Sequence, residues 1–145
     1  MALPVAPRHK ILLDTNIFID YLRVGRHENW VAGTTLGAIR FLSSIVLLEL
    51  RLGADTPRRQ RVIDRIRDGL PSNRIIAPTA ALHDLAGGLF RKLYGFGSGD
   101  RLAAMNDLLI ALSARHIGAE LITSNRTDFE KIASHVRGFR WRLPD

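Results

Sequence analysis

The sequence predicts a single-domain α/β fold, in which a parallel β-sheet of four to five strands is flanked by helices on both faces. The length of 145 residues suits one domain, and a hydrophobic content of 46% is enough to bury a sizeable core. Short apolar runs of strand length alternate along the chain with longer segments of helical periodicity. This alternation is typical of βαβ units, whose strands lie parallel.

The first part of the chain predicts a lead-in followed by strands and helices in turn. Residues 1–9 contain Pro4 and Pro7 and are expected to be unstructured, so the domain is assigned to residues 10–145. Apolar runs predict strands at residues 10–13 and 38–42. The expected helices are residues 16–23, a turn around residues 29–32, and residues 45–52, for which Ser43 or Ser44 is a suitable N-cap and Gly53 a stop.

The second part of the chain continues the alternation. Pro57 suits the first turn of a helix over residues 57–70, and Thr79 is a suitable N-cap for the helix that follows it. The long segment of residues 100–118 is apolar on most sides, so it is expected to be a buried helix. The remaining expected elements are helices at residues 79–94 and 127–136, a glycine-rich turn at residues 95–99, and strands at residues 74–77, 120–123 and 139–142.

Composition restricts the classes of protein to which the chain can belong. The absence of cysteine excludes disulfides and thiolate metal sites and fits a reducing compartment. Without a signal peptide or an apolar stretch of roughly 18 residues, we expect a cytoplasmic protein with no membrane segment. Lys and Arg number 21 against 14 Asp and Glu, giving a net charge of +7, which favours a nucleic acid or an acidic protein as partner. Arginines scattered over a solvated surface would give the same total, so charge alone leaves both explanations open.

Three carboxylates stand inside apolar runs and need a physical explanation. Asp14 follows the first expected strand, Glu49 lies in an apolar helix, and Asp107 interrupts the long helix. An unpaired buried carboxylate is costly, so three of them suggest a shared cation or cationic partners. Purely structural explanations also exist. Asp14 could cap the next helix and Glu49 could face solvent. Asp107 could pair with Arg101 or Arg115.

A fourth polar cluster follows the strand expected at residues 120–123. Thr123 ends this strand, a polar turn carries Asn125 and Asp128, and Phe129 returns to the core. In an open parallel sheet, ligand sites form beyond the carboxyl ends of the strands. The four polar clusters are therefore expected to converge on one edge of the sheet.

In this order and at these spacings, the clusters resemble the PIN domain, and in particular the small VapC toxins of bacterial toxin–antitoxin modules. The resemblance extends over about residues 11–139. It rests on the ordered combination, because each motif alone is weak. The matching segments are Asp14-Thr15-Asn16, Ser44 with Glu49-Leu50, Asn106-Asp107-Leu108-Leu109-Ile110-Ala111, and Thr123-Ser124-Asn125 with Asp128-Phe129.

Carried over residue by residue, the resemblance implies a role for each site residue. Asp14, Glu49 and Asp107 match the family's three near-universal acidic residues and are the expected metal ligands. Asp128 matches the acid before the family's phenylalanine and is expected to join them as a catalytic residue. Many relatives have an acid at the position of Asn125 in this chain. Either this amide or Asp128 is therefore expected to complete the site. The polar residues expected to support the site are Thr15, Asn16, Ser44, Thr123 and Asn125.

The resemblance implies a metal-dependent endoribonuclease that acts as the toxin of a type II pair, is inhibited by a cognate antitoxin and forms a homodimer. Hard oxygen ligands suit Mg²⁺ or Mn²⁺. Two alternatives stay open: a PIN nuclease outside a toxin pair, acting in RNA processing or on structured DNA, and a PIN-fold RNA-binding module without catalysis. The expected RNA contacts lie on the basic helix of residues 57–70, although a solvated helix face would look the same, and they are Arg58, Arg59, Arg61 and Arg65.

Overall fold

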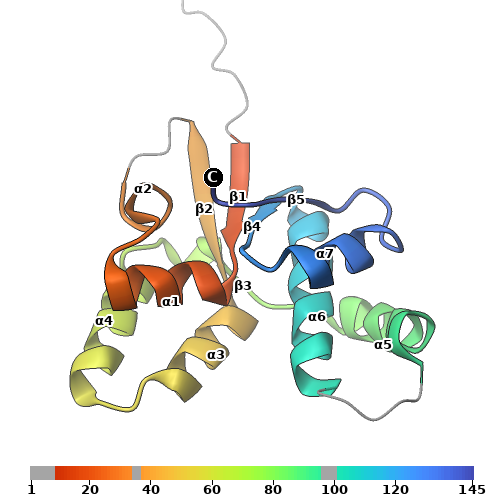
Figure 1. Ribbon diagram of the computed structural model, residues 1–145, viewed down its shortest axis with the longest axis horizontal. Coiled ribbons are helices and arrows are strands. Elements are labelled where there is room, and N and C mark those ends of the chain that lie inside the picture. The colour runs from red at the N-terminus through yellow and green to blue at the C-terminus, as the bar shows by residue number, and fades with distance from the viewer. Residues whose placement is uncertain (1–8, 34–36, 96–100) are drawn as a thin grey trace, which may run out of the picture.

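The structure of the chain, a computed structural model, describes residues 9–33, 37–95 and 101–145 (Figure 1). The expected lead-in lies outside the described residues except for His9, and the expected glycine-rich turn lies outside them except for Gly95. In the described part of the chain, no helix is long and apolar enough to cross a membrane.

A five-stranded parallel sheet forms the centre of the fold and confirms the predicted fold class. The strands are β1 (His9–Leu13), β2 (Ala38–Ser43), β3 (Ile75–Ile76), β4 (Glu120–Ile122) and β5 (Arg140–Arg142). Their order is β3-β2-β1-β4-β5, which places β1 in the middle. Because helices cover both faces, the apolar run Ile11, Leu12 and Leu13 is at most 1% exposed.

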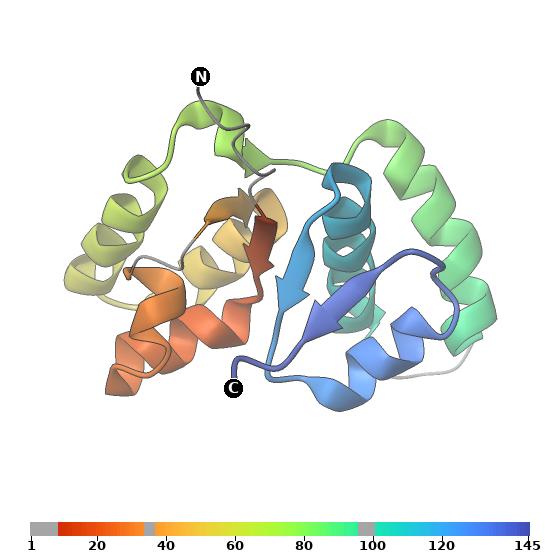
Figure 2. The ribbon, with the colours of Figure 1, turned by 90° about the horizontal axis from the view of Figure 1, so that it is seen from above.

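Helices flank both faces of this sheet. Figures 1 and 2 show α1, α2 and α4 on one side and α5, α6 and α7 on the other, with α3 close to α1 and α6. The long helix α6 is buried along its centre, as its apolar sequence predicts. The helices are α1 (Thr15–Val24), α2 (Glu28–Val31), α3 (Ser44–Gly53), α4 (Pro57–Asp68), α5 (Ala80–Tyr94), α6 (Arg101–Ile117) and α7 (Arg126–Ala133), and Ser72–Arg74 forms a short 3₁₀ turn, η1.

Polar side chains define where most helices begin. Ser43 caps α3 through the Ile45 N–H at 3.1 Å, and Thr79 caps α5 through the Leu82 N–H at 3.2 Å. These caps match the sequence, because a hydroxyl satisfies an N–H that has no partner inside the helix. At the end of α6, Gly118 takes the left-handed conformation, with φ of 69°.

A few element boundaries differ from those expected. Gly53 is the last residue of α3 and not the residue that stops it. The helix α4 ends at Asp68 instead of continuing to residue 70. Strand β3 is only two residues long, because Arg74 belongs to the preceding 3₁₀ turn. Ends of elements depend on local tertiary contacts, which a hydrophobic pattern does not encode.

The polar segments that follow β1, β2 and β4 lie at one edge of the sheet. Since the strands are parallel, the carboxyl ends of β1, β2 and β4 lie at the same edge. The helices α1, α3 and α7 begin there, directly after or shortly after those strands. This edge of the sheet therefore carries the candidate site.

Candidate active site

Asp14 lies at the centre of the site's hydrogen bonds and is only 4% exposed. Its N–H donates to the Ile122 carbonyl at 2.9 Å, which extends the pairing of β1 with β4. Its Oδ1 accepts from the Thr15 N–H at 2.8 Å, so the carboxylate also caps α1. Its Oδ2 accepts from Asn16 Nδ2 at 3.1 Å and from Thr123 Oγ1 at 2.7 Å. The capping role and the site role therefore coexist in one side chain.

Thr123, at the end of β4, joins the turn after that strand to Asp14. Its hydroxyl is fully buried and accepts from Asn16 Nδ2 at 3.2 Å and from the Asn125 N–H at 3.0 Å. Asn16 Oδ1 in turn accepts from the Ser124 N–H at 3.0 Å. Side chains from the ends of β1 and β4 thus hold each other in place, and this limits the positions that the Asp14 carboxylate can take.

Glu49 reaches the same cluster from α3. Its Oε1 accepts from Thr15 Oγ1 at 2.8 Å, and the residue is half-buried. Thr15 therefore connects the carboxylates of Asp14 and Glu49, through its N–H to the former and its hydroxyl to the latter. Glu49 does not simply face solvent, which was the structural alternative for this residue.

Burial is the main reason why the pKa of Asp14 lies above its ordinary value. The negative charge of Glu49 raises this pKa further, while hydrogen bonds from Thr123, Thr15 and Asn16 oppose the rise. Within the described residues, no Lys or Arg side chain forms an ion pair with Asp14. Two adjacent carboxylates without a basic partner are electrostatically unfavourable alone and favourable with a bound cation.

The charges of Asp107 and Asp128 both act on Tyr94, the last residue of α5. Burial raises the pKa of the Tyr94 phenol, and the negative charges of Asp107 on α6 and Asp128 on α7 raise it further. Both carboxylates therefore lie near one phenol although they belong to different helices. The Lys131 ammonium group lies 4.5 Å from the centre of the Tyr94 ring and supplies a positive charge on this side.

Asn125 and Asp128 form a reciprocal cap at the start of α7. Asn125 Nδ2 donates to Asp128 Oδ2 at 2.8 Å, and the Asp128 N–H donates to Asn125 Oδ1 at 3.3 Å. An amide can both donate and accept, whereas an ionised carboxylate at residue 125 could only accept. The amide is therefore suited to hold Asp128, which remains exposed to solvent.

The donor set suits a hard divalent cation. Carboxylate oxygens dominate it, and Mg²⁺ typically binds through one or two protein carboxylates while it keeps several waters. Asp14 and Glu49 form such a pair. In the part of the chain that the structure describes, no three His, Asp or Glu side chains form a ready-made metal cluster.

The acidic and polar residues that the sequence singled out fall into three groups. A hydrogen-bonded network joins Asp14, Thr15, Asn16, Glu49, Thr123, Asn125 and Asp128. Asp107 shares with Asp128 an electrostatic effect on the pKa of Tyr94. Ser44 is the first residue of α3, and the hydrogen bonds of the described residues give the capping role to its buried neighbour Ser43 instead.

Two residues at the site were not expected from the sequence. Tyr94 and Lys131 lie on separate helices, and neither interrupts an apolar run or follows a strand. Only the packing of α5 and α7 near α6 brings them to Asp107 and Asp128. No signal in one sequence could have identified them.

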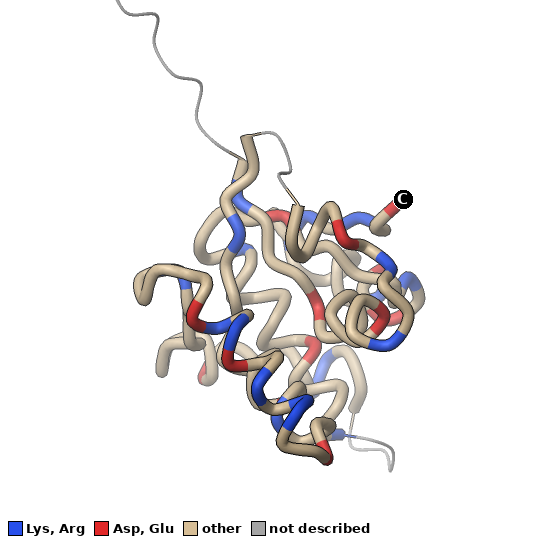
Figure 3. The backbone as a smooth tube through the Cα atoms, turned by 90° about the vertical axis from the view of Figure 1, so that its left-hand side faces the viewer, with Lys and Arg blue, Asp and Glu red and all other residues tan. Residues whose placement is uncertain are grey.

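The basic helix α4 lies on the side of the molecule seen in Figure 3, where basic and acidic positions are interleaved. Arg59 pairs with Asp55 at 2.6 Å. In contrast, three exposed arginines of α4 form no ion pair within the described residues, and these are Arg58, Arg61 and Arg65. The helix thus presents positive charge that is not neutralised by its neighbours.

Comparison with known families identifies the fold. The family model of the PIN domain matches residues 11–134, so the chain belongs to the PIN domain family. Membership of this family supports a nuclease activity for the chain, and PIN nucleases generally use divalent metal ions. A comparison with curated proteins finds no match.

Solved structures similar to this chain include toxin–antitoxin structures of the VapC type. VapBC2 from Rickettsia felis, bound to a DNA fragment from its promoter, has a TM-score of 0.66 at 25% identity and covers 94% of this chain and 99% of its own. VapBC-1 from nontypeable Haemophilus influenzae has a TM-score of 0.64 at 25% identity, with coverages of 93% and 98%. A toxin–antitoxin complex from Klebsiella pneumoniae has a TM-score of 0.62 at 25% identity, with the same coverages.

Proposed function

We propose that this chain is a metal-dependent endoribonuclease and the toxin of a type II toxin–antitoxin pair. The observation that carries the proposal is the buried carboxylate of Asp14, which is oriented by three neighbours and lies close to Glu49 without a basic partner. A carboxylate in such surroundings favours a cation. The nuclease family and the VapC-type structures support the same activity.

Asp14, Glu49 and Asp107 would hold Mg²⁺ or Mn²⁺. When bound, the ion supplies positive charge that polarises the scissile phosphodiester and lowers the pKa of the attacking water. Thr15, Asn16 and Thr123 keep the carboxylate of Asp14 in one orientation. Such preorganisation avoids rearrangement of the site during the reaction.

Glu49 is suited to orient the attacking water. One of its oxygens is held by the Thr15 hydroxyl at 2.8 Å, which fixes the carboxylate while leaving its second oxygen for another donor. Asp128 lies on α7 and is held by Asn125. In hydrolysis, the water oxygen bonds to phosphorus, the bond from phosphorus to the leaving ribose oxygen breaks, and one proton lost by the water is matched by one proton gained by that leaving oxygen.

RNA binding at this site requires basic groups, because a cluster of carboxylates repels phosphates. The arginines of α4 are the proposed source, and Arg58, Arg61 and Arg65 have no competing ion pair among the described residues. Arg59 is already paired with Asp55 and is the weaker candidate.

An antitoxin and a second copy of the chain are the proposed protein partners. The structures similar to this chain include toxin–antitoxin complexes, which supports an antitoxin that silences the nuclease. On α3, Leu48 and Leu52 are 51% and 77% exposed and lie one turn apart, which supports a self-association surface. Binding to RNA and antitoxin would place the protein in the cytoplasm.

Cleavage of RNA by the purified chain tests the proposed activity. We expect single-stranded RNA to be cleaved with Mg²⁺ or Mn²⁺ and to remain intact with EDTA. Asp14→Asn should lower the rate at least about 100-fold, since even outer partners of a metal site are commonly worth 10–100-fold. Asp84→Asn is the matched control, because Asp84 is an exposed carboxylate on α5.

Each alternative function has its own outcome in this experiment. Cleavage of flapped DNA but not of single-stranded RNA would identify a structure-specific DNA nuclease. RNA binding without metal binding or cleavage would identify a non-catalytic module. Equal rates for wild type and Asp14→Asn would refute the assignment of the site.

A further inference from the structure

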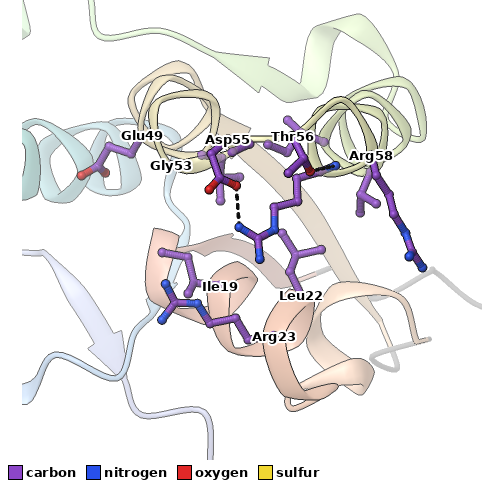
Figure 4. Close-up of a pocket in the computed structure, with 13 residues that line it drawn as sticks. Ile19, Leu22, Arg23, Glu49, Gly53, Asp55, Thr56 and Arg58 are labelled. Atoms are coloured by element: carbon purple, nitrogen blue, oxygen red, sulfur yellow. Dashed lines mark hydrogen bonds and ion pairs between the residues drawn. The ribbon is translucent and has the colours of Figure 1, made fainter.

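A hollow with a volume of about 710 Å³ opens between α1, α3 and α4 (Figure 4). Glu49 lies at one end of this hollow and Arg58 at the other, while Ile19, Leu22 and Arg23 face it from α1. Because Glu49 is also bonded to Thr15 in the carboxylate network, the hollow begins at the candidate active site.

A second hollow, of about 370 Å³, lies between α1, α2, β2 and the later part of α4. Val62 of α4 lines both hollows, so the two hollows are neighbours at this residue. The two together are called the α1–α4 groove below. It extends from Glu49 past Val62 to Arg65 and Arg40.

The charges along the α1–α4 groove become wholly positive with distance from the carboxylates. In the first hollow Glu49 and Asp55 accompany three arginines, and Arg59 is paired with Asp55. Arg23 and Arg58 form no ion pair in the described part of the chain. The residues that line the second hollow include two arginines and no carboxylate. Such a gradient attracts a polyanion whose reacting phosphate lies at Glu49.

Aromatic side chains accompany the positive charge in the second hollow. Phe18 and Tyr21 from α1 and Phe41 from β2 contribute to its lining, and Tyr21 and Phe41 are half-buried. Arg40 is held in place because its Nε donates to the Trp30 carbonyl. Proteins that bind single-stranded nucleic acids combine a basic groove with aromatic rings on which bases stack.

We propose that the α1–α4 groove binds the single-stranded RNA that leads away from the scissile phosphate. Arg23 and Arg58 contact backbone phosphates near the site, and Arg65 and Arg40 contact phosphates further along. Tyr21 stacks on a base. The proposal rests on the proposed nuclease function and adds the path of the RNA strand. Along this path Arg58 and Arg65 are expected to contact RNA and Arg61 is not, because Arg61 lines neither hollow.

An RNA-binding assay on uncleaved complexes tests this path separately from catalysis. The affinity of a fluorescein-labelled single-stranded RNA is measured by anisotropy at several salt concentrations, with Asp14→Asn as the background in every protein. Arg23→Gln and Arg65→Gln should each weaken binding about threefold to fivefold, as expected for one exposed charged contact. Each should also reduce the slope of log affinity against log salt by about 0.7, the contribution of one phosphate contact on a single strand.

Tyr21→Leu provides a second readout that charge does not affect. Loss of one stacked base should weaken binding at least about fivefold and leave the salt slope unchanged. A general loss of structure would change both quantities, and circular dichroism of each variant detects it.

Arg137→Gln is the matched control, since Arg137 is exposed and lies between α7 and β5, away from the groove. It should change neither affinity nor slope. Arg61→Gln, on the same helix as Arg65, should weaken binding less than Arg65→Gln does.

Two results would overturn the proposed path. If Arg23→Gln, Arg65→Gln and Tyr21→Leu bind RNA as the control does, the strand lies elsewhere. If these variants bind RNA normally but bind the antitoxin less tightly, the groove is a protein-docking surface. Neither result affects the nuclease assignment, which fails only if metal-dependent, Asp14-dependent cleavage is absent.

Discussion

Replacing Thr123 by valine tests whether the buried network at the carboxyl ends of β1 and β4 stabilises the fold. Valine has nearly the shape of threonine and lacks the hydroxyl, so the substitution removes hydrogen bonds with little change in packing. The hydroxyl donates to Asp14 Oδ2 at 2.7 Å and accepts from Asn16 Nδ2 and the Asn125 N–H.

The contacts of Thr123 give the expected loss of stability. A hydrogen bond to a charged carboxylate contributes about 1.5–3 kcal/mol. The Asn125 N–H loses its acceptor, which adds about 1 kcal/mol because this residue is half-buried. Asn16 keeps its bond to Asp14 and adds little. We therefore expect Thr123→Val to lower the free energy of unfolding by about 3 kcal/mol and the Tm by about 10 °C.

Urea unfolding of the metal-free protein at pH 7 measures this change, with Thr127→Val as the control. Thr127 is exposed on α7, so its substitution should change the free energy of unfolding by less than about 0.5 kcal/mol. A loss below about 1 kcal/mol for Thr123→Val, or equal losses for the two variants, would refute the reasoning that the Thr123 hydroxyl holds Asp14 in place.

Three further substitutions test the electrostatics and the packing. Because the pKa of Asp14 is raised above its ordinary value of 3.8, the folded state binds this proton more tightly than the unfolded state, and stability is lost as pH rises through the raised pKa. Asp14→Asn should therefore reduce the loss of metal-free stability above pH 4, and Mg²⁺ should raise the Tm of wild type but not of this variant. Ser113→Ala should stabilise the protein by about 1 kcal/mol, because Ser113 Oγ is the one buried side-chain polar atom without a hydrogen bond among the described residues. Trp30→Phe should lower the free energy of unfolding by about 1–3 kcal/mol, because it removes the buried bond from Trp30 Nε1 to the Pro144 carbonyl at 2.8 Å.

Thermal and urea unfolding check all three expectations. Parallel pH profiles of wild type and Asp14→Asn would contradict the raised pKa of Asp14. A less stable Ser113→Ala would show that its hydroxyl has a partner. An unchanged free energy of unfolding for Trp30→Phe would show that the bond from Trp30 Nε1 to the Pro144 carbonyl does not stabilise the fold.

The order of elements could be predicted because it depends on local patterns. The apolar run at Ile11, Leu12 and Leu13 is long enough for a strand and too short for a helix, and it forms the central strand β1. The caps Thr79 and Ser43 also act within a few residues of their own position. Boundaries such as the end of α4 were less accurate, because tertiary contacts decide where the last turn ends.

The candidate site could be predicted in part, for a similar reason. Asp14, Glu49 and Asp107 interrupt apolar runs, and such a conflict is visible in the sequence. Ser43 and Ser44 are equally plausible caps from the sequence, and the structure places the hydroxyl of Ser43 at the start of α3. The roles of Tyr94 and Lys131 had no local signal, since they depend on contacts between helices far apart in the chain.

The sequence by itself determined the parallel α/β class, the family resemblance, the acidic residues proposed for the candidate site and the excess of positive charge. Each of these follows from the type and spacing of neighbouring residues. Only the tertiary structure decided that Thr15 bridges Asp14 to Glu49, that Asn125 holds Asp128, and that α1 and α4 enclose a basic groove beginning at the carboxylates. Those features depend on the distances and directions of side chains from separate elements, and the packing of the helices against the sheet is what fixes them.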